Sequence, residues 1–158
     1  MSKSLIILVV AVSAASVLPL TASSAATGGS FTIDSRLDAK SATNVDAKPR
    51  GESAGDLNVF STSLTRDGHP AGRAEYVQTL VDSHYRGISN RVDLLLSDGT
   101  LELQGAGLEK RPPGGAKPAP ETDLAIIGGT GAYAGARGAV RVTDTSRTTQ
   151  RLTVTLAG

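Results

Sequence analysis

Hydrophobic and polar residues alternate along most of the chain beyond residue 30, with the period of two that is typical of β-strands with one buried face. The segment Phe31–Asp38 shows this pattern simply, because apolar or small residues occupy its odd positions. Similar segments predict eight strands, at 31–38, 57–64, 71–81, 87–97, 100–105, 124–127, 140–142 and 151–156. No segment carries the apolar stripe of an amphipathic helix.

Turn-forming residues between these segments indicate how the strands connect. Asp67-Gly68 and Asp98-Gly99 have the chemistry of tight hairpin turns. Residues 39–54 predict a loop, and the prolines and glycines of 112–120 exclude regular structure there. Strands joined mainly by short turns predict an antiparallel β-barrel, because closure removes the exposed edges of an open sheet. A barrel of about eight strands is just wide enough to hold one small ligand.

The N-terminal residues have the composition of an export signal. In residues 1–26 a lysine precedes an apolar run, and small residues come last. Pro19 and the shortness of the apolar run favour cleavage after Ala26 over a membrane anchor. We therefore expect a secreted protein with a single domain over 27–158 and no membrane association after cleavage.

Charge and composition exclude several classes of partner. The chain has 16 basic and 15 acidic residues, and loss of Lys3 with the signal makes it formally neutral. Nucleic-acid binding usually requires a basic surplus, so we expect no nucleic-acid partner. There is no cysteine, and neither His69 nor His84 has a ligand-like spacing, so we expect no metal and no cofactor. Aromatic residues make up 3% of the chain, so the core must be aliphatic.

A glycine-rich stretch, 128–138, separates two of the predicted strands. Its first glycines, Gly128, Gly129 and Gly131, follow an apolar strand as in a dinucleotide-binding loop. Such a loop must open a helix early in a βαβ unit, whereas only 27 residues follow Gly131 and they alternate as strands do. We therefore interpret the stretch as a tight corner between two strands.

Several motifs occur in the same order as in a known barrel family. They are Gly55-Asp56-Leu57-Asn58-Val59-Phe60-Ser61, Gly72-Arg73-Ala74, Asp98-Gly99-Thr100, Gln104-Gly105, and the Gly-Gly-Thr-Gly corner with Ala136-Arg137-Gly138. Together they resemble plant dirigent proteins and allene oxide cyclases, and the bacterial barrel domains similar to them. The resemblance implies an all-β fold, an eight-stranded antiparallel β-barrel of the allene oxide cyclase/dirigent (calycin-like) type with a central cavity.

Two interpretations of the strand faces remain open. Under simple alternation, four leucines face the barrel interior: Leu94, Leu96, Leu101 and Leu103. Four polar residues of the same strands then face water: Arg91, Asp93, Glu102 and Gln104. The resemblance implies the opposite phase, because positions matching Asn58, Phe60 and Thr62 line the cavity of the plant cyclases. In that phase six further side chains would face the cavity: Tyr76, Gln78, Arg91, Asp93, Glu102 and Gln104. The apolar outer face would then need a cover, which predicts a homo-oligomer, either a dimer or a trimer.

The candidate chemistry depends on these faces. Arg91 and Asp93, if inward, form a pair that could hydrogen-bond a carbonyl oxygen and move a proton. Asp123 matches an aspartate of dirigent proteins, which implies a role in capturing an intermediate; alternatively it accepts backbone hydrogen bonds at a strand edge. Arg137 matches the arginine of the dirigent Ala-Arg-Gly motif, or else it pins the corner. Tyr133 either contacts a ligand or plugs one end of the barrel.

The expected function is that of a secreted barrel that binds a small, partly apolar metabolite and directs a cofactor-free cyclisation or a stereoselective coupling. Thr32 stands where the plant cyclase carries a catalytic Glu, and Ala74 where it has a cavity Cys. The resemblance therefore implies the scaffold rather than that particular cyclase activity. A non-catalytic, lipocalin-like binding protein is the alternative, and a barrel filled by its own side chains is a third.

Overall fold

A computed structural model describes residues 28–82, 87–108 and 121–158 of the chain. These residues form nine strands: β1 (Gly29–Leu37), β2 (Thr43–Val45), β3 (Leu57–Arg66), β4 (His69–Asp82), β5 (Gly87–Leu96), β6 (Gly99–Leu108), β7 (Glu121–Gly131), β8 (Gly138–Asp144) and β9 (Thr149–Leu156). The eight predicted strands are confirmed, and β2 is a short additional strand in the predicted loop 39–54. Within the described ranges, no helix is long and apolar enough to span a bilayer.

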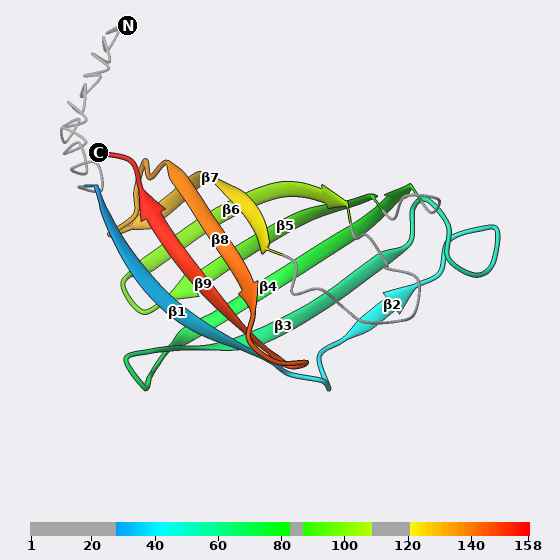
Figure 1. The fold of residues 1–158 in the computed structure, drawn as a ribbon, viewed down its shortest axis with the longest axis horizontal. Coiled ribbons are helices and arrows are strands. Elements are labelled where there is room, and N and C mark those ends of the chain that lie inside the picture. Colours follow the sequence, from blue (N-terminus) through cyan, green and yellow to red (C-terminus); the bar gives the residue numbers. More distant parts are fainter. Residues whose placement is uncertain (1–27, 83–86, 109–120) are drawn as a thin grey trace, which may run out of the picture.

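The strands form one antiparallel sheet that closes into a barrel (Figure 1). From β3 to β9 each strand pairs with the next, and β1 closes the barrel by pairing with both β9 and β3. The pairing of β1 with β3 covers Thr62–Thr65, whereas β2 pairs with Leu57–Val59 of the same strand. The predicted eight-stranded barrel is confirmed, with β2 continuing the position of β1 beyond a bend in the chain.

Residues that tolerate positive φ values make the tight connections. Asp67 and Gly68 have φ values of 51° and 78°, as in a type I′ turn, whose twist matches that of the flanking strands. Between β7 and β8, the Tyr133 N–H donates to the carbonyl of Thr130 at 3.0 Å, and the Ala136 N–H donates to that of Tyr133 at 2.9 Å. The predicted corner between two strands is confirmed.

Alternation decides which side chains fill the barrel. On β5 and β6 the inward residues Val92, Leu94, Leu101 and Leu103 are at most 1% exposed. They belong to a core that also includes Ile33, Leu64, Ala74, Tyr76, Leu124, Ile126, Val140, Val142, Leu152 and Val154. Simple alternation is therefore confirmed for β5 and β6, and the opposite phase implied by the resemblance is wrong for these two strands.

Aromatic side chains close the end of the barrel near the β7–β8 corner. The rings of Phe31 and Tyr133 lie 6.1 Å apart between centroids, and the Arg66 guanidinium lies 4.5 Å from the centre of the Phe31 ring. Tyr133 is 6% exposed, and its hydroxyl donates to the Asp98 carboxylate at 3.2 Å. Of the two predicted roles for Tyr133, the structure therefore supports the plug.

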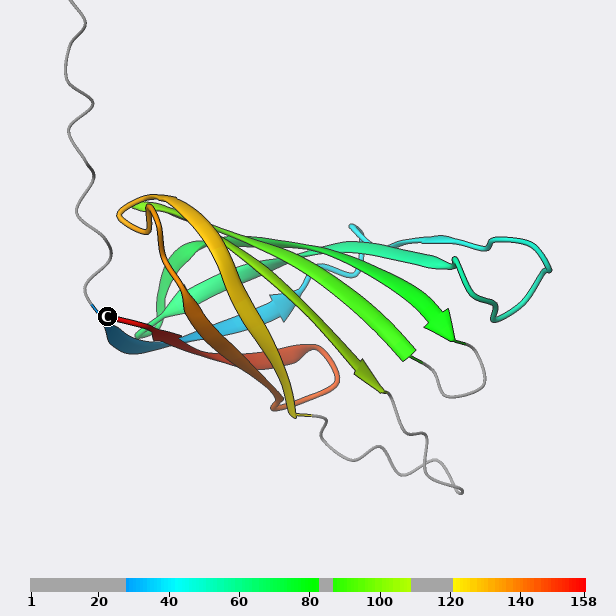
Figure 2. The ribbon, with the colours of Figure 1, turned by 90° about the horizontal axis from the view of Figure 1, so that it is seen from above.

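The barrel is wider at its other end. Figure 2 shows the strands close together near the C-terminus and the β7–β8 corner, and spreading apart toward the ends where β3 and β5 begin. The proposed export signal 1–26 and the loop 112–120 lie outside the described residues. Export and signal cleavage therefore stay predictions.

We expect Gly138→Ala to destabilise the barrel more than Gly135→Ala. Both glycines have positive φ, but a Cβ on Gly138 would lie 2.0 Å from the carbonyl oxygen of Thr155, whereas a Cβ on Gly135 meets nothing within 4 Å. Gly135→Ala should cost only the strain of the left-handed conformation, about 1–2 kcal/mol. Gly138→Ala should cost more, because the β8–β9 pairing must shift. Urea unfolding measures both, and equal losses would contradict the expectation.

Candidate binding cavity

A cavity of about 630 Å³ opens at the wide end of the barrel. This volume lies in the range of small-molecule sites. Apolar parts of its wall come from Leu37, Phe60, Leu80, Ile88 and Val142. Polar parts come from Ser35, Asn58, Gln78, Asn90, Thr122, Asp144 and Gln150. The cavity thus offers both apolar contact and hydrogen-bonding groups, on strands from around the barrel.

Three amide side chains form a row on one wall. Asn58, Gln78 and Asn90 are direct cross-strand partners on β3, β4 and β5. The Asn58 amide donates to Gln78 at 3.2 Å, and the Gln78 amide donates to Asn90 at 2.9 Å. These mutual hydrogen bonds reduce the cost of placing amides in the interior. The row therefore places amide donors and acceptors at the cavity wall.

The facing wall holds a carboxylate and another amide. Gln150 on β9 donates to the Asp144 carboxylate on β8 at 2.9 Å. The two residues are also cross-strand partners at the end of the β8–β9 pairing, beside the cavity mouth. Among the described residues, Asp144 is the acidic group carried by a barrel strand in the cavity wall. It could accept a hydrogen bond or a proton from a bound molecule.

Asp56 organises the loop at the rim of the cavity. Its carboxylate accepts hydrogen bonds from the backbone N–H groups of Ala47 at 2.8 Å and Ser53 at 2.9 Å. The backbone N–H groups of Ser53 and Ala47 hold the pKa of Asp56 below its usual range, against a smaller effect of burial. Asp46 and Glu52, in the same loop, also line the cavity. The loop between β2 and β3 is therefore an ordered part of the rim.

Three buried hydroxyl groups lie inside the barrel, and one of them, that of Ser35, lines the cavity. Ser35 donates to the Thr62 hydroxyl at 2.8 Å, and both residues are buried. Tyr76 stacks on Phe60 with 4.6 Å between ring centroids, and its buried hydroxyl makes no hydrogen bond with the described residues. Burial raises the pKa of Tyr76, while the nearby hydroxyls of Ser35 and Thr62 lower it by less.

The structure brings together five of the residues that the resemblance singled out. Asn58, Phe60 and Gln78 line the cavity, whereas Thr62 and Tyr76 are buried inside the barrel without lining it. The inward phase predicted for β3 and for Tyr76 and Gln78 of β4 is therefore confirmed. Whether these side chains bind a ligand stays a prediction.

The inward orientation predicted for Arg91, Asp93, Glu102 and Gln104 is wrong. Their strand neighbours Val92, Leu94, Leu101 and Leu103 occupy the interior, so these four side chains lie on the outer face. The Arg91 side chain is 65% exposed, and its Nε lies 3.9 Å from the Asp93 carboxylate. The predicted acid catalysis by Arg91 and Asp93 is untested, but it loses the enclosed site on which the prediction depended.

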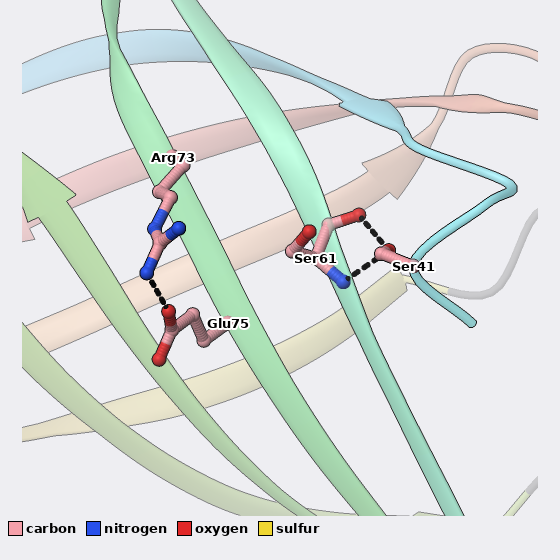
Figure 3. Close-up of polar contacts among 4 residues, drawn as sticks. All are labelled: Ser41, Ser61, Arg73 and Glu75. Atoms are coloured by element: carbon pink, nitrogen blue, oxygen red, sulfur yellow. Dashed lines mark hydrogen bonds and ion pairs between the residues drawn. The ribbon is translucent and has the colours of Figure 1, made fainter. Parts of the chain in front are cut away.

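Other polar contacts lie on the same outer surface (Figure 3). Arg73 and Glu75 of β4 form an ion pair beside β3, where the Ser61 N–H donates to the Ser41 hydroxyl at 2.8 Å. These four residues border a second depression, of about 400 Å³, which also includes Arg91 and Asp93. Exposed pairs of this kind contribute little to stability.

The last two predicted site residues also lie away from the cavity. Asp123 on β7 forms an exposed two-point ion pair with Arg141 on β8, at 2.9 and 3.1 Å. This contact lowers the pKa of Asp123. Arg137, at the closed end, donates to the carbonyl of Ala136, the residue before it, at 2.7 Å, and both of its predicted roles stay predictions. Neither arrangement places the side chain beside the cavity lining.

The correct phase also removes the reason for expecting an apolar outer face. The exposed large hydrophobic residues of the described chain are Val45, Val59, Val77, Val81 and Ile127. The leucines of β5 and β6 that were to be covered by a second subunit are inside the barrel or partly buried. A homo-oligomer therefore stays a prediction without this supporting argument.

Sequence reasoning missed several of the cavity residues. Ser35, Asn90, Asp144 and Gln150 carry no motif. The usable signal was simple alternation, because Asn90 shares a strand face with Val92, and Gln150 shares one with Leu152. Among the described residues no group of three or more His, Asp or Glu side chains could hold a metal ion.

The described strands form a closed antiparallel β-barrel with a cavity at one end, and solved structures that include a dirigent protein share this fold. Among solved structures, a pyocyanin demethylase matches with a TM-score of 0.68 and 20% identity, over 82% of this chain and 100% of that one. A pterocarpan synthase dirigent protein matches with a TM-score of 0.62 and 20% identity, over 82% and 86% of the two chains. An exo-specific intermolecular Diels–Alderase matches with a TM-score of 0.61 and 13% identity, over 84% and 99%.

These matches confirm the barrel fold that the sequence motifs implied. At 13–20% identity they establish the fold and not the activity. No protein-family model matches the chain. No curated protein matches it significantly either. Function must therefore be argued from the cavity.

The Asp56 contacts predict a pH-dependent rim. A carboxyl group whose pKa is lowered by folding stabilises the folded rim above its unfolded pKa of about 3.9, and this contribution is lost as the pH falls through the lower folded value. We therefore expect the amide resonances of Ala47 and Ser53 to titrate together below about pH 4. Asp56→Asn should abolish this titration, whereas Asp123→Asn should leave it unchanged. A common midpoint above pH 4 would contradict the role of Asp56.

Proposed function

We propose that the protein binds a small, partly apolar metabolite in the barrel and directs its cofactor-free cyclisation or stereoselective coupling. The observation that carries the proposal is the cavity of about 630 Å³ in a barrel whose other end is filled by its own side chains. A purely structural barrel would gain stability from filling this space with aliphatic side chains. Asn58, Gln78, Asn90 and Gln150 line it instead.

The composition of the wall defines the class of ligand. Leu80, Ile88 and Val142 can bury the apolar body of a molecule, while the amide row can hydrogen-bond a polar edge. The solved structures with this fold support the same class, because their names describe a demethylase of pyocyanin, a pterocarpan synthase and a Diels–Alderase. Each of these names describes a reaction of a small organic molecule.

Confinement is the means of catalysis that this cavity favours. A wall that holds a flexible molecule in one reactive conformation removes part of the entropic barrier to ring closure, and orientation can contribute on the order of 10 kcal/mol in favourable cases. Ring closure of this kind rearranges bonds within the bound molecule, so the product has the mass of the substrate. Ser35 and the amide row can stabilise an oxygen on which charge develops.

A non-catalytic, lipocalin-like binding protein is the second candidate. The observation that favours it is the chemistry of the inner wall, where amides and hydroxyls are mostly engaged with one another. Such a wall can recognise a ligand by hydrogen bonds, and Asp144, the carboxylate on a barrel strand, is itself bonded to Gln150. The two candidates differ in whether the ligand leaves the barrel chemically changed.

Native mass spectrometry of protein recovered from the culture fluid of its own host tests the proposal. We expect a retained small molecule, and the mass of the chain reports whether residues 1–26 are removed. Ile88→Trp narrows the cavity and should weaken binding of that molecule by at least about tenfold. Val77→Trp is the matched control, because Val77 is 40% exposed on the outer face. Equal binding by both variants would place the ligand elsewhere and contradict the proposal.

Incubation of the recovered molecule and its linear precursors with the protein separates the two candidates. An isomer of equal mass and different chromatographic retention, formed by wild type and not by Ile88→Trp, identifies a cyclase. A molecule that is always returned unchanged identifies a binding protein. The subunit number in the same spectra tests the predicted dimer or trimer.

A further inference from the structure

We propose that the amide row has a direction, and that its donor end, the side-chain nitrogen of Asn90, binds a carbonyl oxygen of the ligand. Asn90 makes the contact, and Gln78 is a positioning residue that orients the Asn90 amide. The inference rests on the proposed function, because it assumes that a small molecule enters the cavity. It adds a carbonyl acceptor, placed beside β5, to the chemistry of that molecule.

The two hydrogen bonds of the row run in the same direction. The Asn58 nitrogen donates to the Gln78 oxygen at 3.2 Å, and the Gln78 nitrogen donates to the Asn90 oxygen at 2.9 Å. An amide whose oxygen faces a neighbour turns its nitrogen away from that neighbour, because both atoms branch from one planar group. The row therefore ends in an acceptor, the Asn58 oxygen, and in a donor, the Asn90 nitrogen. Amides linked in this way polarise one another, which strengthens the terminal donor.

The two ends of the row have different neighbours. Beyond Asn58 the cross-strand partner is Asn44 of β2, another amide that lines the cavity. Beyond Asn90 the partner is Gly105 of β6, which has no side chain to accept a hydrogen bond. A Cβ on Gly105 would lie 2.6 Å from a methyl carbon of Leu124, so apolar packing occupies that space. The donor end of the row therefore has no polar side chain as its next cross-strand neighbour.

The Asn90 nitrogen is a donor that the cavity can reach. It donates to none of the described residues, and Asn90 is a partly buried residue of the cavity lining. The enclosed side-chain atoms without a partner in the described chain are the Tyr76 hydroxyl and one Asp93 oxygen, so the Asn90 nitrogen is not enclosed. An apolar group placed against it would leave its N–H groups without an acceptor, which costs free energy. The site therefore favours a ligand that brings an acceptor to this point.

Apolar residues next to the donor suit the rest of the ligand. Leu80 and Ile88 are cross-strand partners that line the cavity, each two positions from Gln78 or Asn90 on the same inward face. On the other side of Asn90, the next inward residue of β5 is Val92, which is 1% exposed and belongs to the core. A ligand can therefore place its carbonyl oxygen at Asn90 and its apolar body against Leu80 and Ile88.

Two probes of nearly the same shape test the contact. They are 2-acetylnaphthalene and 2-isopropenylnaphthalene, which differ by an oxygen in place of a CH2 group. Calorimetric titration gives the Kd of each probe for wild type and for each variant. The hydration of a probe is the same in every titration, so a change in the ratio of the two Kd values between variants reports the contact with the oxygen. Infrared spectroscopy of isotope-labelled ketone adds a direct signal, because a carbonyl that accepts a hydrogen bond absorbs at lower wavenumber.

We expect Asn90→Leu to reduce the preference for the ketone over the alkene about tenfold and to move the bound carbonyl absorption to higher wavenumber. Gln78→Met keeps the length of the side chain but no longer orients the Asn90 amide, and it should reduce the preference about threefold. A merely structural role of Gln78 would weaken both probes equally and leave their ratio unchanged. Gln104→Met, on the outer face, is the matched control and should change neither the ratio nor the absorption.

The outcomes separate the inference from the proposed function. If both probes bind and Asn90→Leu leaves the ratio and the absorption unchanged, the inference is overturned while the cavity stands. An unchanged ratio in Gln78→Met alone overturns the positioning role of Gln78. If wild type binds neither probe, the proposed binding of small, partly apolar molecules is itself contradicted, and the inference falls with it. Should Asn90→Leu fail to fold, Asn90→Asp carries the test, because its carboxylate still accepts from Gln78 but cannot donate to a ketone.

Discussion

The closure of the sheet through β1 is the constraint on which the rest of the structure depends. This strand pairs with β9 along one edge and with β3 along the other, so the eight barrel strands have no free edge where it lies. Closure fixes which face of every strand is inside. Ser35 illustrates the result, because its cross-strand partners are Gln150 and Leu64, and it therefore faces the interior beside the cavity wall. The pairing of the first strand with the last therefore fixes the inward orientation of this polar residue.

The few aromatic residues of the chain explain why the barrel is filled at one end and hollow at the other. The sequence has two phenylalanines and three tyrosines. Phe31 and Tyr133 fill the closed end, and Phe60 and Tyr76 stack at the middle level. The wide end receives residues such as Asn58 and Ile88, which do not reach across it. The cavity therefore results from where large side chains are placed as much as from the size of the barrel.

The sequence predicted the strands and the corner well because these features are local. Asp67-Gly68 requires positive φ values wherever it occurs, and the alternation of β9 needs no partner to be recognised. The cavity is not local. Asp144 and Gln150 come together only because β8 and β9 end in register, and Asn90 becomes a cavity residue only through its pairing with Gln78. These contacts between strands cannot be predicted from the spacing of residues along the chain.

The error in the phase of β5 and β6 has a physical cause. A slip of one residue exchanges the two faces of a strand, so motif matching across gaps must be correct to the residue. Register shifts occur in this barrel in the β4–β5 pairing, where Val81 of β4 is the extra residue, and in the β6–β7 pairing, where Ile127 of β7 is the extra residue. An extra residue in a strand exchanges odd and even positions, so the inward positions of one strand no longer follow from those of the previous strand by counting residues. The leucines of these strands were the better guide, because burial of a leucine is favoured wherever the count is lost.

Polar residues at inward positions are the part of this structure that the fold does not require. Aliphatic side chains would close the wide end with greater stability, as they do around Val92 and Leu101. Instead Asn58, Gln78 and Asn90 bond to one another, and the buried Tyr76 hydroxyl has no hydrogen-bond partner by distance and angle among the described residues. Departures from the most stable arrangement concentrate where proteins act. Because one barrel fold serves unrelated reactions, the fold alone does not define what this protein does, and the inward polar groups are where the proposed function can be tested.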